Sequence, residues 1–515
     1  MRMWYCHRTS LFVGEEIPIN KEYDTMVRIL LSLMYASKED LGWDPTISMK
    51  LGDNLNKTTY TFDIAGLKFI TDLPDWICDY RASEMHGPGT RVLIGHILID
   101  GKKDKEVVLK DFWMPDDQKP EPETLTEILE SISDEEDKKF VKDHVLWPIR
   151  YERVRVGGVE DHTEKVMQRG NLHLGSTWQA VRVPLFRKEG IYGITKSYWN
   201  KITNDAPHVG RYHYRIIFGI NGETFDTIED SSDLFRVYSD TFSTLQRIHS
   251  AGWVHGDLSP WSVYSYKDPY TNETRGIIGD FGLARKVDSG ENKKSDERQL
   301  LKLRPFLAPE AIEGCYLHKQ YVLSPATPSD LDSDEYSTYR ETKKKRKPII
   351  FRYNYLHDLE SVWWMGVWAL FSFEKHPFED DDAQDVYENA YFRREKLKEL
   401  FKEGSYARTR FLGQPHQFRM DTRRVPDYLL PLTKALFKIR EKLGRMYVVK
   451  EREEDELPVV WNEHSKLHET ILGILEAKEK DLETFTLANT QHWSGLGYIL
   501  SSTRNWVEML GIQDP

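Results

Sequence analysis

The first strong pattern along the chain is a helical repeat of hydrophobic residues. Residues 20–36 place apolar side chains three and four positions apart, which predicts an amphipathic helix. The apolar positions are Met26, Ile29, Leu30, Leu33 and Met34. Because such a helix gains stability by burying its apolar face, we expect it to dock on the main body of the chain rather than to serve a membrane or a partner.

Alternating hydrophobic and polar residues follow this helix. Residues 58–70 and 91–111 alternate with the period of two that is typical of β-strands, and Asp100-Gly101 interrupts the second segment as a turn signal. Residues 120–132 then begin with proline and acidic residues, which is how a helix begins. The pattern predicts a sheet followed by one helix.

Helical periodicity dominates the second half of the chain. Residues 233–250 predict a helix with Asp233 as its N-cap, and helical patterns prevail after residue 356. Strands with one helix, followed by several helices, indicate an α+β fold with two lobes.

This order divides the chain into four expected parts. Residues 1–75 form an N-terminal extension of helix and strands, packed on the main body, and residues 76–225 form a β-rich lobe. That lobe contains a strand-rich insertion at about 155–205. A mostly helical lobe follows over 226–450, and residues 451–515 form a helical tail.

Composition and charge exclude several classes of protein. The 515 residues carry a net charge of −12, which argues against a surface that binds nucleic acid. Cys6, Cys78 and Cys315 give neither a disulfide framework nor a zinc spacing, which suits a reducing compartment. The N-terminus has no recognisable secretory signal, and the longest apolar run, Val362–Phe371, is shorter than the ~20 residues of a membrane helix. We expect an intracellular protein with no membrane or nucleic-acid partner.

Two carboxylates in the middle of the chain carry the candidate chemistry. Residues 255–264 read H-G-D-L-S-P-W-S-V-Y and residues 277–285 read I-I-G-D-F-G-L-A-R, which places Asp257 and Asp280 in two loops. Short apolar segments and a polar turn separate the loops, so a β-hairpin can bring both carboxylates together. One can accept a proton from a hydroxyl while the other holds Mg²⁺ on a phosphate, two functions that phosphoryl transfer requires.

These residues resemble the motifs of protein kinases. H-S-A-G-W-V-H-G-D-L-S-P resembles the catalytic loop, D-F-G-L-A-R the metal loop, and L-A-P-E the end of the activation segment. The chain more narrowly resembles the fungal-type protein kinase domain family. The supporting segments are L-G-W-D-P-T-I (41–47), G-P-G-T-R-V (87–92), V-V-L-K-D-F-W (107–113) and H-D-L-E-S-V-W-W (357–364). The resemblance covers residues 40–440 and implies a bilobal kinase fold with ATP in the cleft.

The resemblance implies a role for each matching polar residue. Asp257 would orient or deprotonate the acceptor hydroxyl, and Asp280 would bind the Mg²⁺ that bridges the ATP phosphates. Lys110 would neutralise the α- and β-phosphates. Lys196 lies in a similar strand context and competes for that role, but Lys110 is preferred because a plausible helix follows it directly. The minor alternative for Lys110 is an ordinary surface lysine.

The remaining contacts to ATP are less sharply specified. Gly87 and Gly89 would let the backbone approach the phosphates, although a plain turn explains two glycines nearly as well. Glu127 has suitable spacing to pair with Lys110 but lies off the apolar face of its helix, whereas Glu121 lies on that face but at the helix start. Which glutamate pairs with the lysine stays open.

Several matches are structural rather than chemical. Asp358 resembles the buried helix aspartate that braces the backbone of the catalytic loop. His255, Phe281 and Gly282 resemble packing residues of the kinase interior, and Glu310 in A-P-E resembles a structural glutamate.

The catalytic loop departs from the kinase pattern at three positions. Ser262 stands where the pattern has the asparagine that binds the second metal, and a hydroxyl is a weaker Mg²⁺ ligand than an amide carbonyl. Gly256 replaces the arginine that pairs with a phosphorylated activation loop, which disfavours that switch, and Ser259 replaces a lysine. We therefore expect a weakened metal site.

An inserted segment at about 316–352 follows A-P-E. It contains Ser324-Pro325 and Thr327-Pro328, which resemble proline-directed phosphorylation sites, and the basic run Lys343–Lys347. The basic run resembles a nuclear-localisation patch, so we expect a nuclear or cytoplasmic location. The alternative is a solvated charge run without such a role.

Three functions remain. The first is a protein kinase that transfers the γ-phosphoryl of ATP to Ser/Thr hydroxyls of protein substrates, with Mg²⁺ as cofactor. The second is a pseudokinase that binds nucleotide or acts as a scaffold, which Ser262 favours. The third is a small-molecule phosphotransferase of the aminoglycoside/choline kinase type, whose loop also has glycine before the aspartate but which lacks A-P-E.

Overall fold

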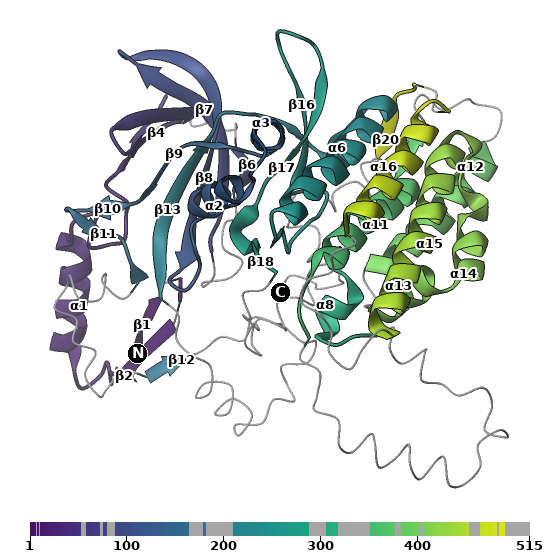
Figure 1. Cartoon of the computed structure of the whole chain (residues 1–515). Helices are drawn as coiled ribbons and strands as arrows, with labels where there is room; N and C mark the ends of the chain where they lie inside the picture. Colours follow the sequence, from purple (N-terminus) through teal and green to yellow (C-terminus); the bar gives the residue numbers. More distant parts are fainter. Residues whose placement is uncertain are drawn as a thin grey trace. The chain divides into compact units, whose positions relative to one another are not determined.

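The computed structural model is drawn in Figure 1. It describes residues 1–6, 8–9, 11–52, 58–72, 76–79, 88–163, 179–181, 210–287, 305–317, 351–375, 383–401, 405–452, 464–481 and 484–489. The described chain forms two compact units. The first contains the described residues up to Glu123 and those between Leu146 and Asn221; the second contains Thr124–Val145 and the described residues from Gly222 onward.

The first unit is built on an eight-stranded antiparallel sheet (Figure 1). Its strands, in spatial order, are β3 (Ile47–Lys50), β4 (Thr59–Ile64), β5 (Leu67–Asp72), β7 (Arg91–Ile99), β8 (Lys102–Pro115), β13 (Arg211–Phe218) and β9 (Pro148–Arg153), with β6 (Trp76–Asp79) also paired to β7. A two-residue turn at Asp100-Gly101 joins β7 and β8, and both residues have positive φ (50° and 76°). Such turns match the twist of the strands they join, and the predicted strands and turn are confirmed.

The core of the first unit lies on one face of this sheet. Alternate residues of the central strands are buried there. They are Phe62, Ile64, Phe69, Leu93, Ile97, Val107, Leu109 and Ile217. Gly95 belongs to the same region, because a side chain there would collide with the carbonyl of Ile70 and the ring of Phe69.

Smaller elements complete the first unit. β1 (Arg2–Cys6), β2 (Leu11–Glu16) and β12 (Gln179–Val181) form a three-stranded sheet, and β10 (Arg155–Val156) pairs with β11 (Val159–Glu160). The predicted strand-rich insertion at about 155–205 otherwise lies outside the described residues.

Helix α1 (Tyr23–Tyr35) forms where the sequence predicts it, but it buries no residue. Val27, Leu30, Leu33 and Met34 are each about half exposed or more, at 48–77%. Met26 and Ile29 of the predicted apolar stripe are half-buried, and none of its residues is fully buried. Docking of this helix on the main body stays a prediction. Hydrophobic periodicity predicts that a helix forms but carries no information about which element lies beside it.

The second unit begins with the rest of α2 (Glu121–Ser131), followed by α3 (Glu135–Asp143). β14 (Glu223–Thr224), the 3-10 turn η2 (Phe225–Thr227) and the long helix α6 (Ser231–Ser250) follow. The N-cap of α6 is Asp230, whose carboxylate accepts from the backbone N–H groups of Ser232 and Asp233 at 2.8 and 3.0 Å. The predicted cap, Asp233, lies in the first turn instead, because the observed N-cap is three residues earlier.

Short strands carry the chain from α6 into the candidate site. They are β15 (Trp253–Val254), β16 (Val263–Lys267), β17 (Thr274–Ile278) and β18 (Arg285–Lys286), with the 3-10 turn η3 (Phe281–Leu283) before the last. β16 and β17 form an antiparallel hairpin, also paired to β14, and β15 pairs with β18. The predicted hairpin between the two acidic loops is confirmed.

Helices make up the remainder of the second unit. They are α8 (Pro309–Glu313), α11 (Tyr355–Ser372), α12 (Ala383–Phe401), α13 (Ser405–Gly413), α14 (Pro415–Asp421), the 3-10 turns η5 (Thr422–Arg424) and η6 (Asp427–Leu429), α15 (Leu430–Arg452) and α16 (His464–Glu479). Two short strands, β19 (Phe373–Lys375) and β20 (Leu487–Asn489), pair with each other. Strands in the first unit and helices in the second confirm the predicted α+β class.

Helix α11 is the centre of the second unit, since all of its residues are buried. A helix that is buried on all sides belongs to the interior of a large domain. Asn354 caps it in a capping box with His357. Among the described helices, none is long and apolar enough to cross a membrane. The predicted basic insertion lies almost entirely outside the described residues, as does much of the tail after 451.

Candidate active site

The loop that carries Asp257 is bent by a glycine. Gly256 has φ +81°, a conformation that side chains rarely adopt, and a Cβ there would lie 3.1 Å from both the Leu283 carbonyl oxygen and Nη1 of Arg285. The glycine that replaces the arginine of the kinase pattern is therefore required by this backbone. The guanidinium of Arg285 lies beside the position that a Cβ atom at Gly256 would occupy.

Asp358 holds the backbone of this loop. From the first turn of α11, its carboxylate accepts hydrogen bonds from the N–H groups of His255 at 2.7 Å and Gly256 at 3.0 Å. It also accepts from the hydroxyl of Tyr353 at 2.7 Å and from Nε2 of His249 at 3.1 Å. Burial alone would raise the pKa of Asp358, but these hydrogen bonds and the nearby histidines lower it to about 2. The carboxylate thus stays ionised and orders the two residues before Asp257.

His255 joins the two acidic loops. Its Nδ1 accepts from the backbone N–H of Asp257 at 3.2 Å, and its Nε2 donates to the carbonyl of Gly279 at 3.0 Å. These two bonds together require a neutral ring with its proton on Nε2. The ring also packs edge-to-face on Phe281, with centroids 4.7 Å apart. The residue before Asp280 is therefore tied to Asp257 through one buried imidazole.

Asp280 adopts a left-handed conformation, with φ 66° and ψ 51°. Aspartate tolerates this region better than most residues. The side chain is exposed, while Phe281 next to it is fully buried. The β16–β17 register pairs Val263 with Ile278, and the N–H of Gly279 donates to the carbonyl of Ser262 at 2.8 Å. The hairpin therefore fixes the backbone on which the exposed carboxylate stands.

Ser262 uses its hydroxyl within the catalytic loop. The hydroxyl accepts from the N–H of Ser259 at 2.9 Å and lies 3.1 Å from the Ser259 carbonyl and 3.3 Å from the Asp257 carbonyl. The residue is 3% exposed. Because one hydroxyl has a single donor and two acceptor positions, these contacts use most of its capacity. The metal-binding role expected for Ser262 stays a prediction.

Lys110 lies on strand β8 in the first unit and forms an ion pair with Glu121 (Nζ–Oε2 3.6 Å). Glu121 is buried in the first turn of α2, and Lys110 also lies 5.2 Å from the centre of the Phe112 ring. Of the two glutamates that the sequence left open, the structure pairs the lysine with this one. Glu127 lies two turns further along α2 and is half-buried, and its role at ATP stays a prediction.

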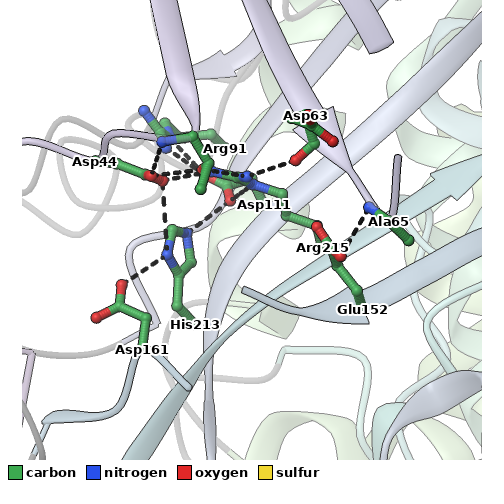
Figure 2. Close-up of polar contacts among 10 residues, drawn as sticks. Asp44, Asp63, Ala65, Arg91, Asp111, Glu152, Asp161, His213 and Arg215 are labelled. Carbon is green, nitrogen blue, oxygen red and sulfur yellow. Dashed lines mark hydrogen bonds and ion pairs between the residues drawn. The ribbon is translucent and has the colours of Figure 1, made fainter. Parts of the chain in front are cut away.

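Figure 2 shows a buried ionic network around Asp111 of β8. Lys110 is the neighbouring residue of the strand, so its side chain lies on the opposite face. Asp111 faces the core side, as Val107 and Leu109 do, because successive side chains of a strand point to opposite faces. Its carboxylate accepts from Nε of Arg91 at 2.9 Å and from a second nitrogen of the same guanidinium. This pair links β7 to β8 beside the lysine.

Two residues of β13 complete the network. His213 Nε2 and Arg215 Nε lie 2.8 and 2.9 Å from the Asp111 carboxylate. His213 Nδ1 lies 3.1 Å from Asp161, and Arg215 also forms an ion pair with Asp44 (Figure 2). Three carboxylates therefore surround two guanidinium groups and one imidazole. The network joins β8 to β13 and to the segment around residue 44.

Two groups of this network, Asp111 and His213, have pKa values shifted toward their charged forms. Burial raises the pKa of Asp111, but the charges of His213, Arg91 and Arg215 outweigh it and hold the pKa well below its usual value. Burial lowers the pKa of His213, but the Asp111 charge and hydrogen bonds to Asp111 and Asp161 raise it above its usual value. The histidine ring also stacks on Trp113 at 4.8 Å.

This network was not predicted from the sequence. Asp44, Arg91 and Asp111 lie within three of the segments on which the family resemblance was based, 41–47, 87–92 and 107–113. The sequence signal that could have revealed it is Asp111, a charged residue that continues the alternation of the apolar residues Val107 and Leu109.

The predicted glycine turn is described only in part. Gly89 has φ +52°, and a Cβ there would lie within 2.8 Å of the guanidinium of Arg8. Gly87 and the rival lysine, Lys196, lie outside the described residues.

The A-P-E segment is anchored by Glu310. Its buried carboxylate accepts from the N–H of Leu317 at 2.6 Å and lies 3.2 Å from Nε2 of His357. Burial lowers the pKa of His357 to about 4. Arg408 donates to the carbonyls of Pro305 and Leu307 just before this segment. Residues 288–304, which would distinguish a peptide platform from a covered pocket, lie outside the described residues.

The donor set suits a metal that arrives with a phosphate ligand. Among the described residues, no three His, Cys, Asp or Glu side chains are grouped to hold a metal ion. Mg²⁺ in phosphoryl-transfer sites keeps several waters and is bound by one or two carboxylates together with substrate phosphates. The exposed carboxylate of Asp280 on a fixed backbone fits that arrangement.

Comparison with protein-family models identifies the family of this chain. The family model described as Fungal protein kinase matches residues 1–370, well over half of the chain. A search of curated proteins finds no match. The matched range contains Lys110, Asp257, Asp280 and Asp358, and it ends within α11.

Proposed function

The chain belongs to the fungal protein kinase family, which suggests a kinase-like function, and on that premise we propose that it transfers the γ-phosphoryl group of ATP to serine or threonine hydroxyls of proteins. The observation that carries this proposal is the order imposed on the residues around Asp257. Asp358 holds the backbone before it, and His255 links it to the residue before Asp280.

Each residue has a distinct task in the proposed reaction. Asp257, half-buried on its fixed loop, orients the acceptor hydroxyl and accepts its proton. Asp280 and Lys110 bind the phosphates, Asp280 through Mg²⁺ and Lys110 directly, with Glu121 orienting the ammonium group. Bound Mg²⁺ supplies charge neutralisation to the transferring phosphoryl group. Because positioning and electrostatics account for most of phosphoryl-transfer catalysis, a rigid loop is the main contribution of the protein.

The anchored A-P-E segment supports a protein acceptor rather than a small molecule. Glu310 is 1% exposed, between the N–H of Leu317 and the ring of His357. The small-molecule phosphotransferases with a similar loop lack this element. We propose protein substrates on this ground.

A pseudokinase is the second candidate, and the contacts of Ser262 favour it. Its hydroxyl is committed to the backbone of Ser259 and Asp257. The second metal would then lack the protein ligand that the kinase pattern provides, and losing one electrostatic contact of this kind costs about 10²–10³-fold in rate. A slow kinase with a weakened metal site and a nucleotide-binding pseudokinase differ only in whether transfer is measurable.

Phosphoryl transfer from labelled ATP by the purified chain tests the proposal. The assay uses Mg²⁺ and then Mn²⁺ with generic protein acceptors, and hydrolysis of the product identifies the phosphorylated amino acid. We expect phosphoserine or phosphothreonine, and a loss of at least about 10²-fold in the Asp257→Asn variant. Transfer that survives in Asp257→Asn contradicts the assignment. Nucleotide binding without transfer with either metal supports the pseudokinase.

A further inference from the structure

A segment beyond the matched range packs on the helix that leads into the catalytic loop. We call residues 464–481 and 484–489 the tail clasp; it consists of α16 and the strand β20 with the residues before it. Helix α16 packs against α6 and α15 (Figure 1). The family match ends at residue 370, so the family does not account for this segment.

The tail clasp holds the first turn of α6. The N–H of Phe485 donates to the hydroxyl of Ser231 at 3.0 Å, and the N–H of Ser231 donates back to the carbonyl of Phe485 at 3.1 Å. The N–H of Leu487 donates to the carbonyl of Glu229 at 2.6 Å. These backbone contacts fix the clasp next to the N-cap of the helix.

The tail clasp also reaches the last turn of α6 through a pair of histidines. Nε2 of His468, on α16, lies 2.9 Å from Nδ1 of His249. Nε2 of His249 lies 3.1 Å from Oδ2 of Asp358, the same oxygen that accepts from the N–H of His255 at 2.7 Å. All four residues are at most 2% exposed. A continuous buried chain of polar contacts therefore runs from the tail clasp to the catalytic loop.

The direction of the hydrogen bonds follows from the carboxylate. Ionised Asp358 can only accept, so Nε2 of His249 carries a proton and donates. In the neutral ring Nδ1 is then an acceptor, and the group that faces it is Nε2 of His468. A proton on Nε2 of His468 thus fixes both the tautomer and the plane of His249. This is how an outer hydrogen bond orients an inner ligand.

We infer that His468 is a positioning residue for the catalytic loop and that the tail clasp is part of the working enzyme. His468 orients His249, which orients the Asp358 carboxylate, which in turn holds the N–H groups of His255 and Gly256. The effect on rate rests on the proposed phosphoryl transfer. The effect on loop order does not.

Two His468 variants and one packing control test this inference in the full chain. His468→Leu removes the donor and keeps an apolar side chain, whereas His468→Gln keeps an N–H donor. Leu475→Ala is the control, because Leu475 is fully buried on α16 about two turns from the relay. Amide hydrogen exchange of the peptide 254–258 reports loop order, and kcat and KM for ATP report its use.

We expect His468→Leu to speed exchange at 255–257 and to lower kcat about 10–100-fold with KM unchanged, since small misplacement of reacting groups costs this much. His468→Gln should keep both the exchange rate at 255–257 and kcat close to those of the wild type. Leu475→Ala should lower only the melting temperature. If amide exchange at 255–257 is no faster in His468→Leu than in Leu475→Ala, the inference is overturned. If the wild-type chain transfers no phosphoryl group, the proposed function fails, and the exchange comparison still decides the role of His468.

Discussion

Each unit of this protein contains a fully buried aspartate at its centre, and the two are stabilised in opposite ways. Asp111 in the first unit is surrounded by Arg91, Arg215 and His213, which carry full positive charges when protonated. Asp358 in the second unit is held instead by two backbone N–H groups, a tyrosine hydroxyl and a histidine. Guanidinium charges dominate around the first aspartate, whereas hydrogen-bond donors, with His249 foremost, hold the second.

This difference corresponds to what each aspartate holds. The ion pairs of Asp111 join the neighbouring strands β7, β8 and β13, so the network stabilises the sheet that carries Lys110. Asp358 contacts a loop whose own N–H groups would otherwise be buried without partners. Breaking the first leaves uncompensated charge, whereas breaking the second leaves neutral donors. The comparison predicts a larger stability loss for the first.

The largest expected effect is therefore that of Asp111→Asn. Removing one partner of a buried ion pair costs about 3–5 kcal/mol, and here the charge of Arg215 stays buried. The variant leaves Arg91 and Arg215 facing a neutral amide. Urea titration followed by hydrogen exchange of peptides from β8 measures the free energy of unfolding of the first unit.

Asp72→Asn is the matched control for this variant. Asp72 pairs with Lys103 between strands of the same sheet at 3.4 Å, but both side chains are about half exposed (41% and 50%). Exposed pairs contribute about 0–1 kcal/mol. A loss in Asp111→Asn no larger than in Asp72→Asn would show that the ionic network does not stabilise the sheet.

The parts of the fold that depend on local pattern could be predicted from the sequence. The strands of 91–111, their turn at Asp100-Gly101 and the hairpin between the acidic loops follow from alternation and turn residues. The family was identified for a related reason. Its motifs are short, contiguous segments whose residue types are fixed by chemistry.

The parts that depend on distant contacts could not be predicted. Spacing and helix face left both Glu127 and Glu121 open as partners of Lys110, and the ion pair forms with Glu121. The His468–His249 contact joins residues more than two hundred positions apart. Periodicity reports the face of an element and not its neighbours, as the exposed α1 also shows.

Asp358→Asn is expected to have an intermediate effect. It removes charge-assisted hydrogen bonds but strands no opposite charge, so the cost is about 1.5–3 kcal/mol. The amide nitrogen would face at least one backbone donor of His255 or Gly256. Urea denaturation of the second unit measures the free energy of unfolding, which should fall. Amide exchange at 255–257 should become faster in the same variant. A loss equal to or above that of Asp111→Asn would contradict the distinction between ionic and dipolar sites.

The smallest expected effect is a difference in pH dependence between the two units. The pKa of His213 is raised above 6.5 in the folded chain, so its contribution is complete below pH 6.5 and is lost as pH rises through the folded value. The slope is at most about 1.4 kcal/mol per pH unit for one proton.

The pKa of His357 in the second unit is lowered to about 4, so its contribution is lost only as pH falls from 6.5 toward 4. Denaturation experiments at pH 6 and pH 8 should therefore show a lower free energy of unfolding at pH 8 for the first unit only. His213→Gln should remove that difference. An unchanged slope in His213→Gln would assign the alkaline loss to groups outside the network.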